Sequence, residues 1–357
     1  GPAHAASFTL NSNGTFAYTP AAAFSGVDTF TYKANDGTAD SNVATVTINV
    51  VPTLSVAASG AASLKPGEQY TYTFNYTVNA TTTNTVVAFT LPGHATFVSN
   101  TGSFTCTSAA GVVTCPLGTV SANGSFTATV AVDKLKKINT PLVLNATAYS
   151  INATSAVLTN GTATVSANTL TPFADVPAGY WGINYIQSIW AYGITSGCIN
   201  SPLSYCPDNP ISRAEMAIYI ERGVHGGSFN PGVLPLTYTD TSTSLAKYFI
   251  EALKNDGITG GCGGTLFCPS ASISRAQMAV FLLRGRQGSA YLPPAATGTV
   301  WSDVPATHWA ARWAEDLGNR SISSGCGAGK FCPESPITRA EMAVLMQRTF
   351  SLPLPTP

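Results

Sequence analysis

Charged residues are scarce in this 357-residue chain. Seventeen Lys and Arg residues balance 17 Asp and Glu residues, so charged residues make up 10 % of the chain and the formal net charge is zero. A typical soluble domain has about 25 % charged residues. Without a basic excess, the sequence gives no reason to expect binding to nucleic acid or to an anionic membrane surface. Few charges with abundant Thr, Ser, Asn, Ala and Gly favour an extracellular β-rich protein, and the length predicts roughly two to four domains.

Catalytic motifs are also lacking. The sequence contains no G-x-S-x-G, H-E-x-x-H, Walker loop or dinucleotide fingerprint. Its four histidines are scattered, which argues against acid–base catalysis. Asp28, Asp36 and Asp40 could bind Ca²⁺ at the edge of a module, but they do not form a dense D-x-D cluster. We therefore expect neither enzymatic activity nor a cofactor or metal.

Long hydrophobic segments are absent as well. No apolar run reaches the roughly 20 residues of a membrane span, and no signal peptide is recognisable at the start of the sequence. If the protein is secreted, its signal peptide was removed or lies outside this sequence.

The eight cysteines fall into four local pairs. The pairs are Cys106 with Cys115, Cys198 with Cys206, Cys262 with Cys268, and Cys326 with Cys332. An even number and local spacing predict four disulfides, and hence an oxidising compartment. Zinc binding is the alternative interpretation, although zinc sites favour C-x₂₋₄-C spacing with further Cys or His residues nearby.

The composition changes near residue 170. No arginine precedes Arg213 and no tryptophan precedes Trp181, while the earlier residues alternate Thr, Val, Asn and Ala in short stretches. Alternation of this kind predicts strands, and the later half shows helical periodicity. The sequence therefore predicts all-β modules at 1–50 and 51–169, followed by an all-α region at 170–357.

Residues 1–50 contain hairpin signals. Asn13-Gly14 lies between two alternating apolar runs. The pattern G-T-F-x-Y-T-P…F-x-G-x-D-x-F-x-Y…D-G resembles the cadherin-like Ig repeats of large bacterial surface proteins. The resemblance implies that only the later strands of such a module are present, so its edges and apolar surface should be exposed. Either the chain is a fragment of a longer one, or a neighbouring molecule supplies the missing strands.

Residues 51–169 form a second predicted β module. Tyr70–Val78 and Ser125–Val132 alternate in the manner of half-buried strands. The segment Leu91–Phe97, followed by Cys106 and Cys115, resembles a second type of bacterial Ig-like surface repeat. That resemblance implies an all-β Ig-like sandwich with a hairpin held together by a disulfide.

One pattern occurs three times after Phe173, at a period of about 64 residues. Each copy has an aromatic-x-Asp opening, a Gly-Ile-x-x-Gly-like segment with a cysteine, an aromatic-Cys-Pro segment and an Ile-[Ser/Thr]-Arg-Ala-[Glu/Gln]-Met helix start. These elements resemble the S-layer homology repeat, with copies at about 171–225, 236–287 and 299–350. The resemblance implies that three helix–loop–helix copies pack into one bundle.

Helical spacing identifies the expected core positions. In the first copy, Trp181, Tyr185 and Ile189 recur at i, i+4 and i+8, which predicts an apolar stripe on one helix. The second helix of each copy places Met216, Met278 or Met342 on an equivalent face. We expect these side chains to form core rather than a ligand site.

The repeated arginine has two interpretations. Ser212, Ser274 and Thr338 should cap their helices, with Glu215, Gln277 and Glu341 reaching back in capping boxes. A cation at the first helical position opposes the helix dipole, so Arg213, Arg275 and Arg339 suggest a partner anion, either a ligand at the helix N-terminus or an internal salt bridge to Asp175, Asp240 or Asp303.

The resemblance also implies a ligand. In S-layer homology repeats, arginines of this motif and nearby Asp and Trp residues line grooves that bind cell-wall polysaccharide, often an acidic pyruvylated sugar. The corresponding candidates here are Arg213, Arg275, Arg339, Asp175, Asp303, Trp181 and Trp309. The second copy departs from the pattern, because Asp240 is not followed by Val-Pro and Tyr248 replaces the tryptophan.

The resulting expectation is a non-enzymatic, extracellular bacterial cell-surface protein. Its repeats would anchor it non-covalently to an acidic wall polysaccharide or peptidoglycan, and the Ig-like modules would project outward. The alternative is a self-assembling S-layer or filament subunit, in which a neighbouring chain completes the first β module.

Overall fold

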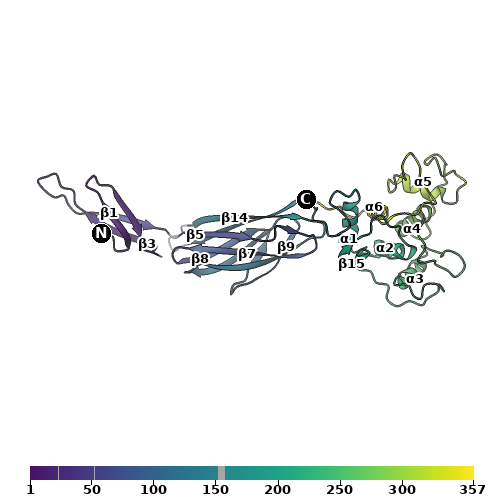
Figure 1. Cartoon of the computed structure of the whole chain (residues 1–357), viewed down its shortest axis with the longest axis horizontal. Helices are drawn as coiled ribbons and strands as arrows, with labels where there is room; N and C mark the ends of the chain where they lie inside the picture. The colour runs from purple at the N-terminus through teal and green to yellow at the C-terminus, as the bar shows by residue number, and fades with distance from the viewer. Residues whose placement is uncertain (23, 52, 152–156) are drawn as a thin grey trace. The chain divides into compact units, whose positions relative to one another are not determined.

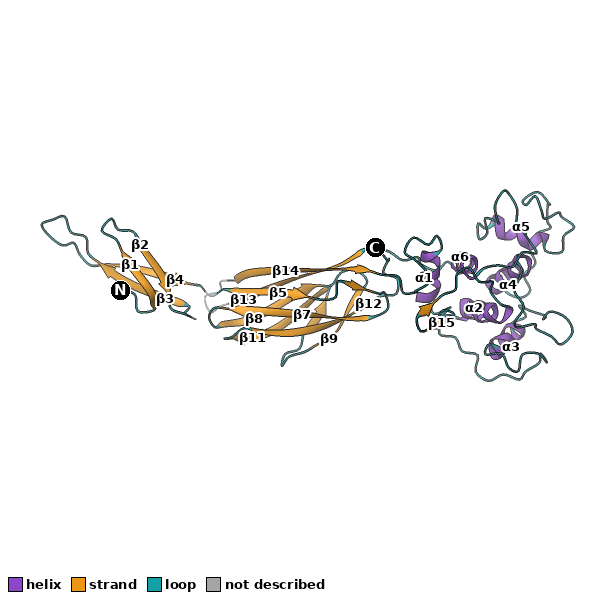
Figure 2. Ribbon diagram, viewed as in Figure 1, coloured by secondary structure: helices purple, strands orange, loops and turns teal. Residues whose placement is uncertain are grey.

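The computed structural model describes residues 1–22, 24–51, 53–151 and 157–357. These residues group into two compact units. The first unit comprises 1–133 with 140–169, and the second comprises 134–139 with 170–357. The strand-rich first unit and the helical second unit are distinguished by colour in Figure 2.

The first unit is built from strands. They are β1 (Ala5–Leu10), β2 (Phe16–Pro20), β3 (Gly26–Tyr32), β4 (Ala44–Val50), β5 (Leu54–Ser59), β6 (Ser63–Leu64), β7 (Gln69–Val78), β8 (Thr82–Thr90), β9 (Ala95–Asn100), β10 (Thr107–Ala109), β11 (Val112–Val120), β12 (Gly124–Val132), β13 (Pro141–Ile151) and β14 (Val157–Thr169).

The first four strands form two antiparallel hairpins, β1–β2 and β3–β4. Asn13-Gly14 lies in the turn of the first hairpin, with Gly14 at φ +86°, which confirms the hairpin signal. Asp28 is buried and accepts hydrogen bonds from the Ala3 and His4 N–H groups and from the Tyr18 hydroxyl. Its carboxylate thus joins the two hairpins.

The remaining strands of the first unit form a six-stranded sheet, β10-β11-β8-β13-β14-β6, and a four-stranded sheet, β5-β7-β12-β9. Their shared core includes the stacked rings of Phe74, Phe89 and Phe126. The Cys106–Cys115 disulfide joins the start of β10 to β11 next to the register pair Thr107–Thr114, which confirms the stapled hairpin. The other three predicted disulfides are also present.

All six helices of the described residues lie in the second unit (Figure 1). They are α1 (Ile183–Ala191), α2 (Arg213–His225), α3 (Lys247–Asn255), α4 (Arg275–Gln287), α5 (Ala311–Asn319) and α6 (Arg339–Phe350). The unit is not all-α as expected. A hairpin of β15 (Ile199–Asn200) and β16 (Leu203–Ser204) forms inside the loop that the Cys198–Cys206 disulfide closes.

The helices of the three copies close into a cycle. Helices α2, α4 and α6 contact one another pairwise, and α1, α3 and α5 pack against α6, α2 and α4 respectively. One hydrophobic core runs through all three copies. The predicted core methionines Met216, Met278 and Met342 are fully buried there. Each copy is too small to bury its apolar face alone, so the neighbouring copies cover it.

A ring of backbone hydrogen bonds lies inside this cycle. The Ile273 N–H donates to the Ile211 carbonyl, the Ile337 N–H to the Ile273 carbonyl, and the Ile211 N–H to the Ile337 carbonyl, at 2.9–3.2 Å. All three isoleucine side chains are buried. The third copy is therefore bonded to the first as well as to the second.

One detail differs from expectation. Helix α1 begins at Ile183, so Trp181 precedes the helix and is 61 % exposed instead of belonging to the apolar stripe. The i, i+4 spacing of Trp181 and Tyr185 therefore does not place both residues on this helix. The C-terminal segment is bonded to the rest of the unit, because Ser188 donates to the Pro353 carbonyl and the Thr356 N–H to the Leu135 carbonyl.

Candidate functional site

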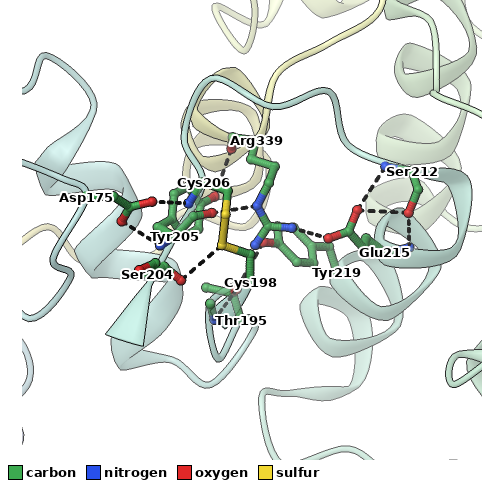
Figure 3. A network of polar contacts seen from close by, with 11 residues as sticks. Asp175, Thr195, Cys198, Ser204, Tyr205, Cys206, Ser212, Glu215, Tyr219 and Arg339 are labelled. Carbon is green, nitrogen blue, oxygen red and sulfur yellow. Dashed lines mark hydrogen bonds and ion pairs between the residues drawn. A yellow bond between two sulfur atoms is a disulfide. The ribbon is translucent and has the colours of Figure 1, made fainter. Parts of the chain in front are cut away.

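The repeated aspartates hold the disulfide loops. The Asp303 carboxylate accepts hydrogen bonds from the N–H groups of Phe331 and Cys332, both at 2.8 Å. Asp175 and Asp240 bind the corresponding groups of their own copies, and Figure 3 shows this arrangement in the first copy. Desolvation acts to raise the pKa of Asp303 and Asp240, but the backbone donors outweigh it and hold each pKa below its usual value.

The repeated arginines connect neighbouring copies. Arg275 is 4 % exposed; its Nε donates to the Phe331 carbonyl at 2.7 Å, and Nη1 lies 3.1 Å from Glu341 Oε1. Its guanidinium also stacks on the Phe331 ring. The equivalent contacts of the other copies are Arg213 with the Phe267 carbonyl and Gln277, and Arg339 with the Tyr205 carbonyl and Glu215. Burial lowers the pKa of Arg275 and Arg213.

The helix N-termini are closed by backbone from the next copy. The Arg275 N–H donates to the Ser335 carbonyl and the Ala276 N–H to the Pro333 carbonyl, and the same pairs recur at α2 and α6. An anion therefore cannot take these two N–H groups, so the expected anion site at the helix N-terminus is wrong. Among the described residues, no salt bridge joins these arginines to the repeated aspartates either. In the described residues, the ion pairs of Arg275 and Arg339 go to glutamates.

The capping boxes are confirmed in two copies. Ser212 with Glu215 and Thr338 with Glu341 form the complete reciprocal box. In the second copy Ser274 accepts from the Gln277 N–H, but the Gln277 side-chain oxygen accepts from Arg213 instead of closing the box. The Gln277 side chain thus accepts a hydrogen bond that joins the first copy to the second.

Two hollows lie beside these arginines. Hollow A has a volume of about 150 Å³ and is lined by Trp181, Arg275, Ile322, Ser323, Ser324, Gly325, Glu341, Val344, Leu345 and Arg348. Hollow B has a volume of about 290 Å³ and is lined by Arg213, Ile258, Thr259, Gly260, Gly261, Cys262, Gln277, Val280, Phe281, Arg284 and Trp309. Each hollow combines residues from all three copies.

The two hollows have matching walls. Each has the Gly-Ile-type loop of one copy, the motif arginine of the preceding copy and the exposed tryptophan of the following copy. Trp181 is 61 % exposed and Trp309 is 58 % exposed. In each case the exposed indole ring lies beside the concavity. Of the predicted residues, the structure brings Arg275 together with Trp181, and Arg213 together with Trp309.

The third equivalent position lacks the tryptophan. Trp181 and Trp309 each lie two residues before their helix, and Leu245 has this place before α3, where it is fully exposed. Tyr248, which spacing suggested as the replacement, lies inside α3 instead. The second copy reaches its helix one residue sooner after Asp240, so Leu245 and not Tyr248 occupies the position of the tryptophan.

Sequence reasoning missed a second set of arginines. Arg222, Arg284 and Arg348 each lie nine residues after the motif arginine and donate to the Ile194, Ile258 and Ile322 carbonyls respectively. Arg284 and Arg348 line the two hollows and are only partly buried. The recurrence of an arginine nine residues after the motif arginine in all three copies is the sequence feature that could have identified them.

Comparison with protein families identifies two kinds of domain. A bacterial cadherin-like domain matches residues 1–52, and the S-layer homology domain matches residues 237–279 and 302–343. The chain therefore contains a cadherin-like domain and two S-layer homology domains, which are the second and third copies. These domains identify a bacterial cell-surface protein.

Curated relatives include S-layer proteins. The S-layer protein EA1 of Bacillus anthracis is 30 % identical over 181 residues, which cover 50 % of this chain and 20 % of EA1. An uncharacterized cell wall amidase of Bacillus anthracis is 28 % identical over 193 residues, covering 51 % of this chain and 33 % of the amidase. The matched part thus spans about a fifth to a third of these relatives.

Among solved structures, BcpA, the major pilin subunit of Bacillus cereus, is similar with a TM-score of 0.30. The identity is 12 %, and the match covers 47 % of this chain and 65 % of BcpA. Among the described residues, none of the helices combines the length and apolar character that a membrane span requires.

Proposed function

We propose that the second unit anchors this cell-surface protein to the bacterial cell wall by binding an acidic wall polysaccharide or peptidoglycan in hollows A and B. The first unit is the outward spacer. The observation that carries the proposal is the matching pair of hollows, each with an exposed tryptophan, two arginines and a glycine-containing loop.

In this proposal the first copy, residues 171–225, is also an S-layer homology repeat, in addition to the two matched domains. Support comes from the cycle of contacts, because the Tyr205 carbonyl, Asp175 and the Ile211 backbone make the same hydrogen bonds as their equivalents in the two matched domains. The three copies together make one helical bundle, with boundaries at about 171–225, 236–287 and 299–350.

The chemistry of the hollows suits a charged sugar polymer. The exposed faces of Trp181 and Trp309 are apolar platforms on which a sugar ring can stack. Arg348 and Arg284 present partly exposed guanidinium groups at the wall, which can pair with a carboxylate of the polymer. The buried motif arginines contribute positive charge and fix the position of the loops. Asp175 and Asp303 act on the shape of those loops and do not contact the ligand.

We also propose that the chain is not an enzyme. The relative named as an amidase raises the question, but the match covers a third of that protein. The wall of each hollow is made of arginines, aromatic residues and loop backbone, with a single carboxylate in hollow A that is already paired with Arg275. Neither hollow holds a histidine or a cysteine thiol for nucleophilic or acid–base chemistry.

Co-sedimentation of the whole chain with purified cell walls tests the proposal. The double variant Trp181→Ala/Trp309→Ala should bind at least about tenfold more weakly, because an aromatic platform contributes about 1–2 kcal/mol at each site. The matched control is Leu245→Ala, which removes an exposed apolar side chain at the equivalent third position. Equal binding by both variants and the wild type would reject the hollows as the wall-binding sites.

A second candidate function is self-assembly through the first domain. Leu10, Phe16, Val27 and Val43 are exposed apolar side chains on or beside the two hairpins, and paired two-stranded sheets of this size leave open edges. Light scattering on the whole chain at rising concentration distinguishes this candidate. A stable monomer at high concentration would eliminate it, whereas filaments or sheets would make assembly the main function.

A further inference from the structure

Three ionisable side chains converge where the first copy meets the second. Glu221 and His225 lie one turn apart on α2, and Asp256 is the C-terminal cap of α3. His225 Nε2 is 2.7 Å from Asp256 Oδ2 and 3.5 Å from Glu221 Oε2. The three ligand-type atoms lie within 4.8 Å of one another. The same imidazole nitrogen therefore faces two carboxylates.

Glu221 is the most buried of the three side chains. Its side chain is 0 % exposed, and neither carboxylate oxygen has a hydrogen bond among the described residues. Burial, with a contribution from the charge of Asp256, raises the pKa of Glu221 to about 8. A buried carboxylate that lacks donors is costly and needs a nearby positive charge to stay ionised.

The fold of the repeat does not require this carboxylate. The positions equivalent to Glu221, eight residues after the motif arginine, carry Leu283 in the second copy and Gln347 in the third. Leu283 is fully buried in the core there. A leucine at residue 221 would satisfy packing, so a carboxylate at this place has a cost without a structural benefit.

Local electrostatics favour a cation at this point. The C-terminal end of a helix carries partial negative charge from its free carbonyls. Asp256 adds a carboxylate to that end of α3, and Glu221 adds a second one across the contact. His225 is neutral or singly charged, so it cannot balance all three contributions when both carboxylates are ionised.

We propose that Glu221, His225 and Asp256 bind a divalent transition-metal ion, with Zn²⁺ as the best match. Imidazole nitrogen and carboxylate oxygen are both zinc ligands, whereas Ca²⁺ prefers six to eight oxygen ligands. Zinc ligands in tetrahedral geometry lie about 3.3 Å apart, so small side-chain shifts place the ion between Nε2 and the two oxygens. His225 and Asp256 are about one-third exposed, which leaves the remaining position open to water.

The bound ion would join α2 of the first copy to α3 of the second. It would supply the positive charge that Glu221 lacks and add a link to the cycle of repeats. Two other clusters of Asp with two Cys lie in the disulfide loops, but their sulfur atoms are bonded to each other and cannot act as thiolate ligands.

Isothermal titration of the chelator-treated whole chain with ZnCl₂, without reductant, tests this site. All cysteines are in disulfides, so they do not compete for the ion. The wild type should bind one Zn²⁺ per chain, and its melting temperature should rise. Glu221→Leu, which introduces the residue found at the equivalent position 283, and His225→Gln should each weaken Zn²⁺ binding about 100-fold or more. Loss of a residue that only hydrogen-bonds a metal ligand already lowers metal affinity about 10–100-fold, and these two residues are proposed as ligands themselves.

His308→Gln is the matched control, because His308 Nε2 also lies close to a carboxylate, 3.3 Å from Glu334 Oε1, in a pair without a buried partner. It should leave the affinity within about twofold. Circular dichroism of Glu221→Leu checks that it is folded, and Co²⁺ binding gives a visible absorption signal that only the intact site should show. No saturable binding by the wild type, or one ion per chain retained in both site variants, would overturn the proposal.

Discussion

Replacing Arg275 by alanine should destabilise the second unit by about 3 kcal/mol. The charge-assisted hydrogen bond to the Phe331 carbonyl accounts for about 1.5–3 kcal/mol, because the carbonyl would lose its donor in a buried place. The pair with the partly exposed Glu341 adds about 0.5–1 kcal/mol, and stacking on Phe331 adds about as much.

Urea denaturation followed by tryptophan fluorescence measures this loss selectively. All five tryptophans lie between residues 181 and 313, within the second unit, so the signal comes from that unit alone. At a slope of about 2 kcal/mol/M, the transition midpoint should fall by about 1.5 M while the slope itself is unchanged.

Arg286 provides the control because it lies on the same helix and is exposed. Arg286→Ala should change the free energy of unfolding by less than about 0.5 kcal/mol. Arg275→Met, which keeps most of the side-chain volume, should still lose about 2 kcal/mol because the hydrogen bond is absent. If Arg275→Ala matches the Arg286 control, the arginines do not hold the copies together.

Two further perturbations test the disulfide loops. Asp303→Asn should cost about 1–2 kcal/mol, because an amide offers one acceptor oxygen to the two N–H donors of the loop. Since the folded-state pKa of Asp303 is lowered, the wild-type carboxylate stabilises above pH about 4 and loses this contribution as the pH falls through its folded pKa. The stability difference between wild type and Asp303→Asn, measured in urea, should therefore shrink toward pH 3, and a constant difference would contradict the carboxylate's role. Replacing Cys326 and Cys332 by serine should cost about 2 kcal/mol for so short a loop, and an unchanged urea midpoint would show that the loop is held by other contacts.

Local patterns in the sequence predicted local structure well. The helix starts at Arg213, Arg275 and Arg339 followed from their Ser or Thr caps, because capping involves residues three apart. The four disulfides followed from cysteine spacing, and the Asn13-Gly14 hairpin from turn chemistry. Each of these features depends on neighbouring residues, so tertiary packing did not change them.

The roles that depend on closure of the cycle were not predictable. Arg339 contacts Tyr205, which lies 134 residues earlier, and the α6 N-terminus is bonded to the carbonyls of Asn209 and Pro207. No spacing within one copy reveals that the third copy returns to the first. The same holds for the cluster of Glu221 with Asp256, which forms only where the first and second copies meet.

The number of ligand sites on the whole chain is the most direct test of the hollows. Calorimetric titration with soluble fragments of the acidic wall polymer should give two sites on the wild type. Trp181→Ala and Trp309→Ala should each leave one site of wild-type affinity and weaken the other about tenfold, and Leu245→Ala should leave both affinities unchanged. Two sites of wild-type affinity in both tryptophan variants would contradict the assignment of hollows A and B as the anchoring sites.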